Sequence, residues 1–246
     1  MRIAIVSDIH GNLPALEAVI ADIKDRKPDM VINLGDCVSG PLWPREVCDL
    51  LISLNWLTIQ GNCDRAVGEK SRNAMSTSDG FAYDQLDNHH RQWLANLQKP
   101  QFITKNIFAC HGTPIDDEDY LTDKILGDAL VAKTPDELTA MLNGVDAPIV
   151  LCGHSHVPRI IKSSGATTVL NPGSVGLPAY ESEWEGKTYY AESGSPHARY
   201  AMLTEVNAKF SVDLIAIDYD YTSSAQKADS EKFRDYARAL SQGAMS

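Results

Sequence analysis

Five short apolar runs, each followed within two residues by a polar motif, constrain this chain more than any other feature of its sequence. The runs are four or five residues long, which is typical of buried strands. Ligands in open α/β sheets bind at the carboxyl ends of the strands, so motifs at five strand ends are expected to converge on one place. The motifs are Asp8-x-His10, Gly35-Asp36, Gly61-Asn62, His111-Gly112 and Gly153-His154-x-His156.

The N-terminal part of the chain alternates between strand and helix patterns. Apolar residues recur at helical spacing after the first apolar run and again after the second. Asn12 can cap the first of these helices, and Pro14 suits its first turn. The resulting β-α-β-α-β order predicts parallel strands joined by right-handed crossovers. The helical positions are Ala15, Leu16, Val19, Ile20 and Ile23, then Val47, Leu50, Leu51 and Leu54.

The remainder of the chain is less regular. We predict one domain over residues 1–246, because 246 residues are enough for one sizeable core. Residues 65–100 are polar and mostly helical in pattern, which predicts a helical insertion near the mouth of the site. Residues 181–198 show no regular pattern, and residues 225–240 indicate a helix. Later strand-like segments predict a second, largely antiparallel sheet section. These segments are Ile160-Ile161, Thr167 to Leu170, Tyr200 to Thr204 and Phe210 to Ile217.

The side chains in the motifs form a mixed set of nitrogen and oxygen donors. Two carboxylates, four imidazoles and one amide oxygen are too many for one metal ion, and they suit two ions if one carboxylate bridges them. Such a set favours Mn, Fe, Zn or Ni over Ca or Mg, which prefer shells of oxygen. The donors are Asp8, His10, Asp36, Asn62, His111, His154 and His156.

The charge of the chain restricts its partners. Its 22 Lys and Arg against 33 Asp and Glu give a net charge of −11, so its surface repels duplex DNA and anionic membranes. Two cations with two aspartates and a bridging hydroxide would still leave a local charge of about +1, which attracts a phosphate. No signal peptide is apparent, and no apolar run reaches the roughly 18 residues of a membrane span. We therefore expect a cytoplasmic protein; no pattern indicates its oligomeric state.

These motifs, in this order, resemble those of the calcineurin-like metallophosphoesterase superfamily. The resemblance covers roughly residues 1–177 and takes Gly61-Asn62-Cys63-Asp64 as the third motif. The segments from Ser7 to Asn12 and from Leu170 to Gly176 are similar to small bacterial and archaeal members of phosphodiesterase type. The resemblance implies an α/β fold in the form of a four-layer α/β/β/α sandwich, with two mixed sheets flanked by helices.

The resemblance also implies two metal sites that share Asp36 and a role in catalysis for part of the set. A metal-bridging hydroxide would attack phosphorus in line with the leaving oxygen, with Mn as the expected ion in vitro. The first site would consist of Asp8, His10, Asp36 and His156, and the second of Asp36, Asn62, His111 and His154. Catalytic roles are implied for Asp36, Asn62, Cys63, Asp64 and His111.

One position departs from the pattern of many relatives. Their third motif carries a histidine that binds phosphate or protonates the leaving group, whereas this chain has Cys63. A thiol is a weaker hydrogen-bonding partner than an imidazolium ion. We therefore expect less assistance for poor leaving groups such as alkyl alcohols than for aryl alcohols. Arg65 and Arg159 are candidates to bind phosphate oxygens, and a solvated surface position is the alternative for both.

The leading hypothesis is an enzyme, a metal-dependent phosphodiesterase acting on a small phosphate ester or nucleotide-type substrate. The first alternative is a phosphomonoesterase, including a protein or nucleotide phosphatase. The second is a scaffold of the same fold that has lost turnover and serves as an interaction module. All seven donor positions are present, which favours the enzyme.

Overall fold

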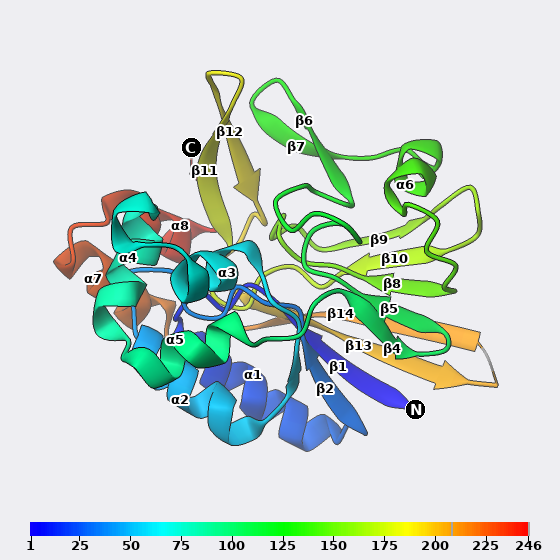
Figure 1. The fold of residues 1–246 in the computed structure, drawn as a ribbon, viewed down its shortest axis with the longest axis horizontal. Helices are drawn as coiled ribbons and strands as arrows, with labels where there is room; N and C mark the ends of the chain where they lie inside the picture. Colours follow the sequence, from blue (N-terminus) through cyan, green and yellow to red (C-terminus); the bar gives the residue numbers. More distant parts are fainter. Residues whose placement is uncertain (208, 246) are drawn as a thin grey trace.

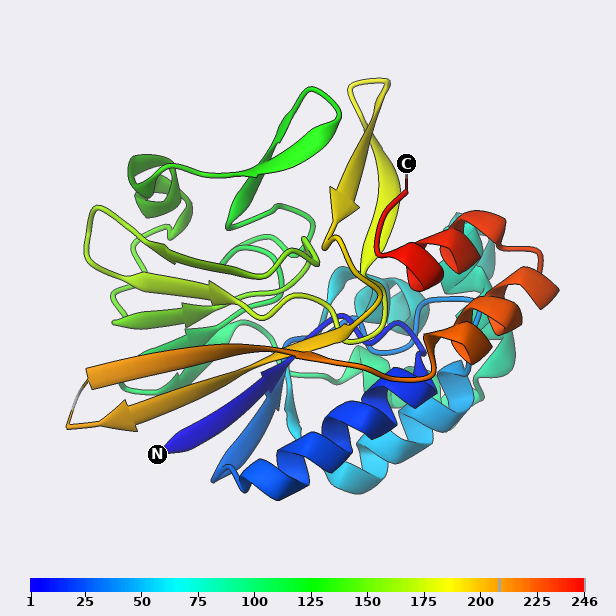
Figure 2. The same ribbon diagram turned by 180° about the vertical axis from the view of Figure 1, so that it is seen from behind.

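The fold is a sandwich of two five-stranded sheets whose outer sides are covered by helices (Figures 1 and 2). The computed structural model describes all residues except 208 and 246. Alternate residues of β1 (Arg2–Val6) face opposite ways: Ile3 and Ile5 pack against the second sheet, while Ala4 and Val6 pack against helices. This division of one strand between two cores confirms the predicted four-layer α/β/β/α architecture.

The first sheet has the order β14-β13-β1-β2-β3. Strands β1, β2 (Met30–Asn33) and β3 (Leu57–Thr58) are parallel, as predicted, and α1 (Leu13–Arg26) and α2 (Pro44–Leu54) connect them. The side chain of Asn12 caps α1 by accepting the backbone N–H of Ala15. Strands β13 (Ala198–Val206) and β14 (Lys209–Ile217) add an antiparallel hairpin beside β1.

The second sheet has the order β4-β5-β8-β10-β9. Strands β5 (Ile107–Ala109), β8 (Ile149–Leu151) and β10 (Thr168–Asn171) are parallel; β4 (Gln101–Thr104) and β9 (Arg159–Lys162) flank them antiparallel. Helix α6 (Pro135–Met141) packs Leu138 on the outer side. The prediction that the last third of the chain forms a separate antiparallel section is therefore wrong, because its strands join both sheets.

A third, four-stranded sheet with the order β11-β12-β7-β6 was not predicted. It consists of the hairpins β6 (Asp123–Leu126) with β7 (Ala129–Ala132) and β11 (Ala179–Trp184) with β12 (Lys187–Glu192). Both hairpins project away from the two larger sheets (Figure 1). The expectation of irregular structure over residues 181–198 is wrong for residues 181–192 and holds for residues 193–197. Positive φ angles at Glu185 (50°) and Gly186 (73°) make the tight turn that lets β11 and β12 pair.

The remaining helices fall into two groups: those of residues 62–95 pack into the same core as α1 and α2, and the C-terminal pair lies near the β11–β12 hairpin (Figure 1). Residues 62–95 contain α3 (Asn62–Glu69), the 3-10 turn η1 (Arg72–Ala74), α4 (Thr77–Gln85) and α5 (Asn88–Ala95). Residues 225–240 form parts of two helices, α7 (Tyr221–Ser230) and α8 (Arg234–Gln242), where one was predicted. Within the described residues, no helix is long and apolar enough to cross a membrane.

Candidate metal centre and its cleft

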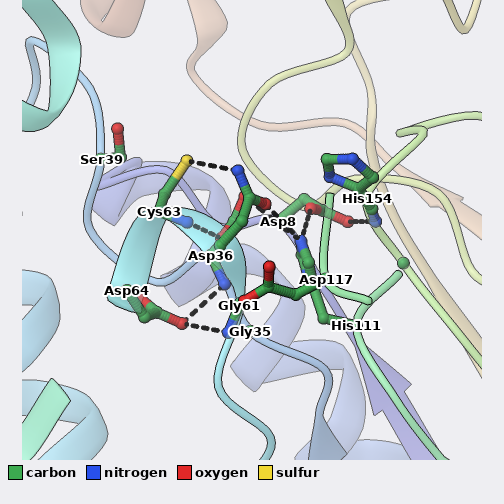
Figure 3. A network of polar contacts seen from close by, with 12 residues as sticks. Asp8, Gly35, Asp36, Ser39, Gly61, Cys63, Asp64, His111, Asp117 and His154 are labelled. Atoms are coloured by element: carbon green, nitrogen blue, oxygen red, sulfur yellow. Dashed lines mark hydrogen bonds and ion pairs between the residues drawn. The ribbon is translucent and has the colours of Figure 1, made fainter. Parts of the chain in front are cut away.

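The structure brings the seven predicted donor side chains together at the carboxyl ends of β1, β2, β3, β5 and β8. They form two groups, and the donor atoms within each group lie within 4.8 Å of one another. Asn62 joins the second group, because its Oδ1 lies 3.1 Å from His111 Nε2. Figure 3 shows part of this convergence, with Asp8, Asp36, His111 and His154 drawn together. The groups are Asp8, His10 and His156, and Asp36, His111 and His154.

Five of the seven donors have a backbone in the left-handed region, where a side chain costs roughly 1–2 kcal/mol per residue. Positive φ at Lys27 and Asn55 is ordinary, since both residues end helices. The five donors end no helix, and such strain gathers at functional sites. Their φ angles are 55° at Asp8, 50° at His10, 55° at Asp36, 69° at His154 and 60° at His156.

Backbone contacts hold these strained loops in place. The N–H of Asp8 donates to Gly35 O (2.9 Å), and the N–H of His10 donates to Asp36 O (3.0 Å), so the loops after β1 and β2 support each other. Two glycines permit a close approach: a Cβ on Gly61 would lie 2.2 Å from Asp36 Oδ1, and one on Gly153 would lie 2.0 Å from Ser7 Oγ. These glycines leave room for the neighbouring donors.

Each imidazole is oriented by a backbone carbonyl. A carbonyl can only accept, so Nδ1 of His10, His111 and His156 must carry the proton it donates. The acceptors are Ser39 O (2.7 Å), Leu34 O (2.8 Å) and Leu177 O (2.7 Å), respectively. His154 is reversed, with its Nε2–H donating to Glu118 O at 2.8 Å. Three rings therefore turn Nε2 toward the centre, and His154 turns Nδ1 toward it.

This arrangement fits two cations. His10 Nε2 and His156 Nε2 lie 3.1 Å apart with both of their Nδ1 atoms already donating, so these two nitrogens approach favourably only with a positive charge, a proton or a metal ion, between them. Asp8 is fully buried, and its Oδ1 has no hydrogen-bond partner among the described residues. Asp36 Oδ2 lies 3.8 Å from His10 Nε2 and 3.4 Å from His111 Nε2, which places this carboxylate between the two groups.

Electrostatics in the centre agree with that reading. Burial, followed by the neighbouring His156, lowers the pKa of His10, and burial with the nearby His111 lowers the pKa of His154 to about 4. Burial also opposes the charged form of His111, yet the carboxylates of Asp36 and Asp8 raise its pKa to about 10. Without a metal ion, the centre thus draws a positive charge onto His111.

Two of the predicted catalytic residues have different surroundings. Asp64 is fully buried and accepts the backbone N–H groups of Asp36 (2.8 Å), Cys37 (2.9 Å) and Gly61 (3.1 Å), so it braces the loop that carries Asp36 (Figure 3). Cys63 lines the cleft, and its N–H donates to Asp36 Oδ1 at 2.9 Å. Burial and then the charge of Asp36 raise the pKa of the Cys63 thiol, which keeps it protonated.

A cleft of about 920 Å³ opens above the centre. Its floor includes His10, Asp36, Asn62, His154 and His156. Its walls come from α4, from residues 116–120, from the hairpin β11–β12 and from α8. Sequence reasoning missed the tyrosines of these walls. For Tyr180 and Tyr189, the available signal was Glu185-Gly186, a pair of residues that suits a two-residue turn between two strands. The tyrosines are Tyr120, Tyr180, Tyr189 and Tyr236.

Neither arginine considered as a phosphate ligand lines the cleft. Arg159 pairs with Asp123 at 2.9 Å. Arg65, on α3, makes a two-pronged contact with Asp117 (both distances 2.7 Å) and a third bond to Glu118 Oε1 at 2.9 Å. Since Glu118 O fixes the ring of His154, Arg65 ties the helix that begins with Asn62 to the loop that orients His154.

Comparisons with known proteins agree with this geometry. The family model of the calcineurin-like phosphoesterase superfamily domain matches residues 1–191. The protein MJ0912 of Methanocaldococcus jannaschii is 28% identical over 251 residues, covering 92% of this chain and 90% of that protein. Phosphodiesterase YfcE of Escherichia coli is 26% identical over 188 residues, covering 72% of this chain and 81% of that protein.

A solved structure extends the likeness to the whole fold. The crystal structure of a metallophosphoesterase from Sphaerobacter thermophilus superposes with a TM-score of 0.76 and 25% identity, covering 98% of this chain and 100% of that one. The family model covers most of the sequence and includes every one of the five motifs. The chain therefore belongs to the calcineurin-like phosphoesterase superfamily, in which it is similar to members from bacteria and archaea.

Proposed function

We propose that the protein is a phosphodiesterase that hydrolyses small phosphate esters with two divalent transition-metal ions. The observation that carries the proposal is the donor set at the floor of the cleft. A buried carboxylate oxygen of Asp8 accepts no hydrogen bond, the Nε2 atoms of two imidazoles face each other, and Asp36 stands between both groups. The similarity to a phosphodiesterase, YfcE, supports the type of reaction.

The ligands divide into two sites that share Asp36. The mixed nitrogen and oxygen donors suit Mn, Fe, Zn or Ni, and we propose Mn for activity in vitro. Ions bound there would supply Lewis acidity to a phosphoryl oxygen and activate a water molecule. Asp8, His10, Asp36 and His156 would hold the first ion, and Asp36, Asn62, His111 and His154 the second.

The protein's own residues determine which ester is favoured. No lysine or arginine is among the described residues that line the cleft, and Cys63 offers a neutral thiol where many relatives carry an imidazole. A monoester dianion brings one more negative charge than a diester, and only the metal centre would neutralise it. This difference favours the diester over the phosphomonoesterase alternative.

The scaffold alternative conflicts with the state of the donors. Five strained backbone positions and a buried carboxylate oxygen of Asp8 that accepts no hydrogen bond destabilise the fold unless a bound cation compensates for them. A module that had lost its ions would gain stability by relaxing these positions. We also propose that residues 1–246 act as one unit, because residues from His10 to Met245 line the same cleft.

The proposal is tested by reloading metal-stripped protein with Mn²⁺ and offering an aryl phosphodiester and the matching monoester. Faster hydrolysis of the diester, with two ions bound per chain, is expected. Faster hydrolysis of the monoester would support the phosphatase alternative. Two bound ions without turnover of either ester would favour the scaffold. Parallel reloading with Zn²⁺, Fe²⁺ and Ni²⁺ ranks the metals.

A further inference from the structure

Among the described residues, every charged side chain in the walls of the cleft is acidic. Besides the donors, six carboxylates line it, and its described lining residues include no lysine or arginine. The six come from three separate segments of the chain, so they do not form one local run of charge. They are Asp116, Glu118 and Asp119 from the loop after β5, Glu181 and Glu183 from β11, and Asp235 from α8.

Among the described residues, most of these carboxylates form no ion pair with a lysine or arginine. Glu118 is paired with Arg65 at 2.9 Å, and Asp235 lies 3.8 Å from Arg238. In the described part of the chain, no ion pair forms at Asp119, Glu181 or Glu183. A substrate entering the cleft therefore meets negative walls and, at the floor, a centre that is positive only when its ions are bound.

Aromatic side chains stand in the same walls and contact the floor. The ring of Tyr120 lies 4.8 Å from that of His154, and the ring of Tyr180 lies 4.7 Å from that of His156. The hydroxyl group of Tyr120 is 2.6 Å from that of Tyr180 and 2.7 Å from that of Tyr189, which locks the three tyrosines into one cluster. A group attached to a phosphorus atom at the floor would extend beside these rings.

We infer that the preferred diester carries a small alcohol with a fixed positive charge, of the quaternary ammonium type. This inference rests on the proposed function and specifies its substrate class. Aromatic side chains attract such cations, and the wall carboxylates add a long-range attraction. The same walls repel additional phosphate groups, so nucleoside diphosphates, triphosphates and oligonucleotides are poor substrates. The alternative is an ordinary solvated rim, which would not distinguish a cation from a neutral group.

The decisive experiment compares two aryl diesters with the same p-nitrophenol leaving group. One carries choline, and the other carries 3,3-dimethylbutanol, the uncharged carbon analogue of choline with the same shape. Because only the charge differs, the ratio of their kcat/KM values isolates the effect of the walls. We expect the choline ester to be favoured about tenfold at low ionic strength and less in salt. A ratio of one or below overturns the inference.

Wall variants test the cause of that ratio. The double substitution Glu181→Gln with Glu183→Gln removes two charges, and the ratio should fall to about threefold. The matched control is Glu17→Gln with Asp213→Asn, which removes two exposed charges outside the cleft lining and should leave the ratio unchanged. Equal loss in both double variants would show that net charge, not the cleft, sets the preference, and would overturn the inference.

A binding measurement separates this inference from the proposed function. Calorimetry of the Mn²⁺-loaded protein with phosphocholine and with 3,3-dimethylbutyl phosphate needs no turnover. If neither diester is hydrolysed but phosphocholine binds about tenfold more tightly, the charge preference stands and the proposed reaction fails. If diesters are hydrolysed but the two phosphates bind equally, the reaction stands and the charge preference fails.

Discussion

The candidate metal centre and the walls of the cleft above it are built in opposite ways. The donors of the centre are mostly buried at strand ends, and backbone carbonyls fix each imidazole. The charged residues of the walls are exposed and come from a loop, a hairpin and a C-terminal helix. A rigid floor can hold chemistry that tolerates little displacement, while walls on surface elements can change and so set the choice of substrate.

The largest expected effect comes from the residue that lies between both halves of the floor. Asp36→Asn should remove one charge from both sites and lower kcat/KM by about a thousandfold or more. Metal analysis after dialysis should show less than two ions per chain. Glu183→Gln, a wall variant, should keep both ions. Full metal content with normal activity in Asp36→Asn would contradict the shared role of Asp36.

The floor should also respond to pH in a way that the walls do not. The metal-free protein holds a proton on His111, whose pKa is raised to about 10, so metal binding must displace that proton at lower pH. Apparent metal affinity should therefore rise about tenfold per pH unit between pH 7 and 9 and level off as the pH approaches 10. Calorimetry at pH 8 in buffers of different ionisation enthalpy should detect at least one released proton. No proton release would refute this account of His111.

Arg65 joins α3 to the wall loop at Asp117 and Glu118, and its replacement tests whether this loop supports the donors at the floor. Arg65→Ala should free the loop whose Glu118 carbonyl orients His154, and metal affinity at the second site should fall about tenfold. Manganese titration followed by electron paramagnetic resonance measures this affinity directly. Arg65→Lys keeps the charge but loses the two-pronged bond to Asp117, so it should recover only part of the affinity. Unchanged affinity in Arg65→Ala would remove the positioning role.

The smallest expected effect concerns Cys63, which lies where floor and wall meet. Cys63→His introduces a side chain that can donate a proton to a leaving group, so turnover of alkyl diesters should rise several-fold relative to aryl diesters. The ratio of kcat values for a matched pair of alkyl and aryl esters provides the measurement, with Cys63→Ser as a control of similar size. No gain on alkyl esters would mean that Cys63 does not limit protonation.

The same contrast explains what the sequence could predict. The floor was predictable, because Asp8, Asp36 and His111 each follow an apolar run typical of a strand. The carboxyl ends of parallel strands meet at one edge of a sheet, so these side chains were expected to lie close together. The role of Asp64 was not, because its partners are backbone N–H groups of Asp36 and Cys37, which are distant in sequence.

The walls escaped prediction for another reason. Half of the positions in β11 and β12 are exposed and half carry polar or charged side chains, so the apolar alternation that marks a strand is weak. Their pairing depends on the turn at Glu185-Gly186 and on contact with β7, which is far away in the chain. The break between α7 and α8 was also not predictable, because residues 225–240 have a composition that favours a helix throughout.

The central claim is a pair of metal ions at the floor of the cleft, and anomalous scattering from crystals of the protein grown with Mn²⁺ tests it most directly. The account predicts two anomalous peaks. One should lie among Asp8, His10, Asp36 and His156, and the other among Asp36, Asn62, His111 and His154. A single peak, or peaks away from these side chains, would contradict the claim.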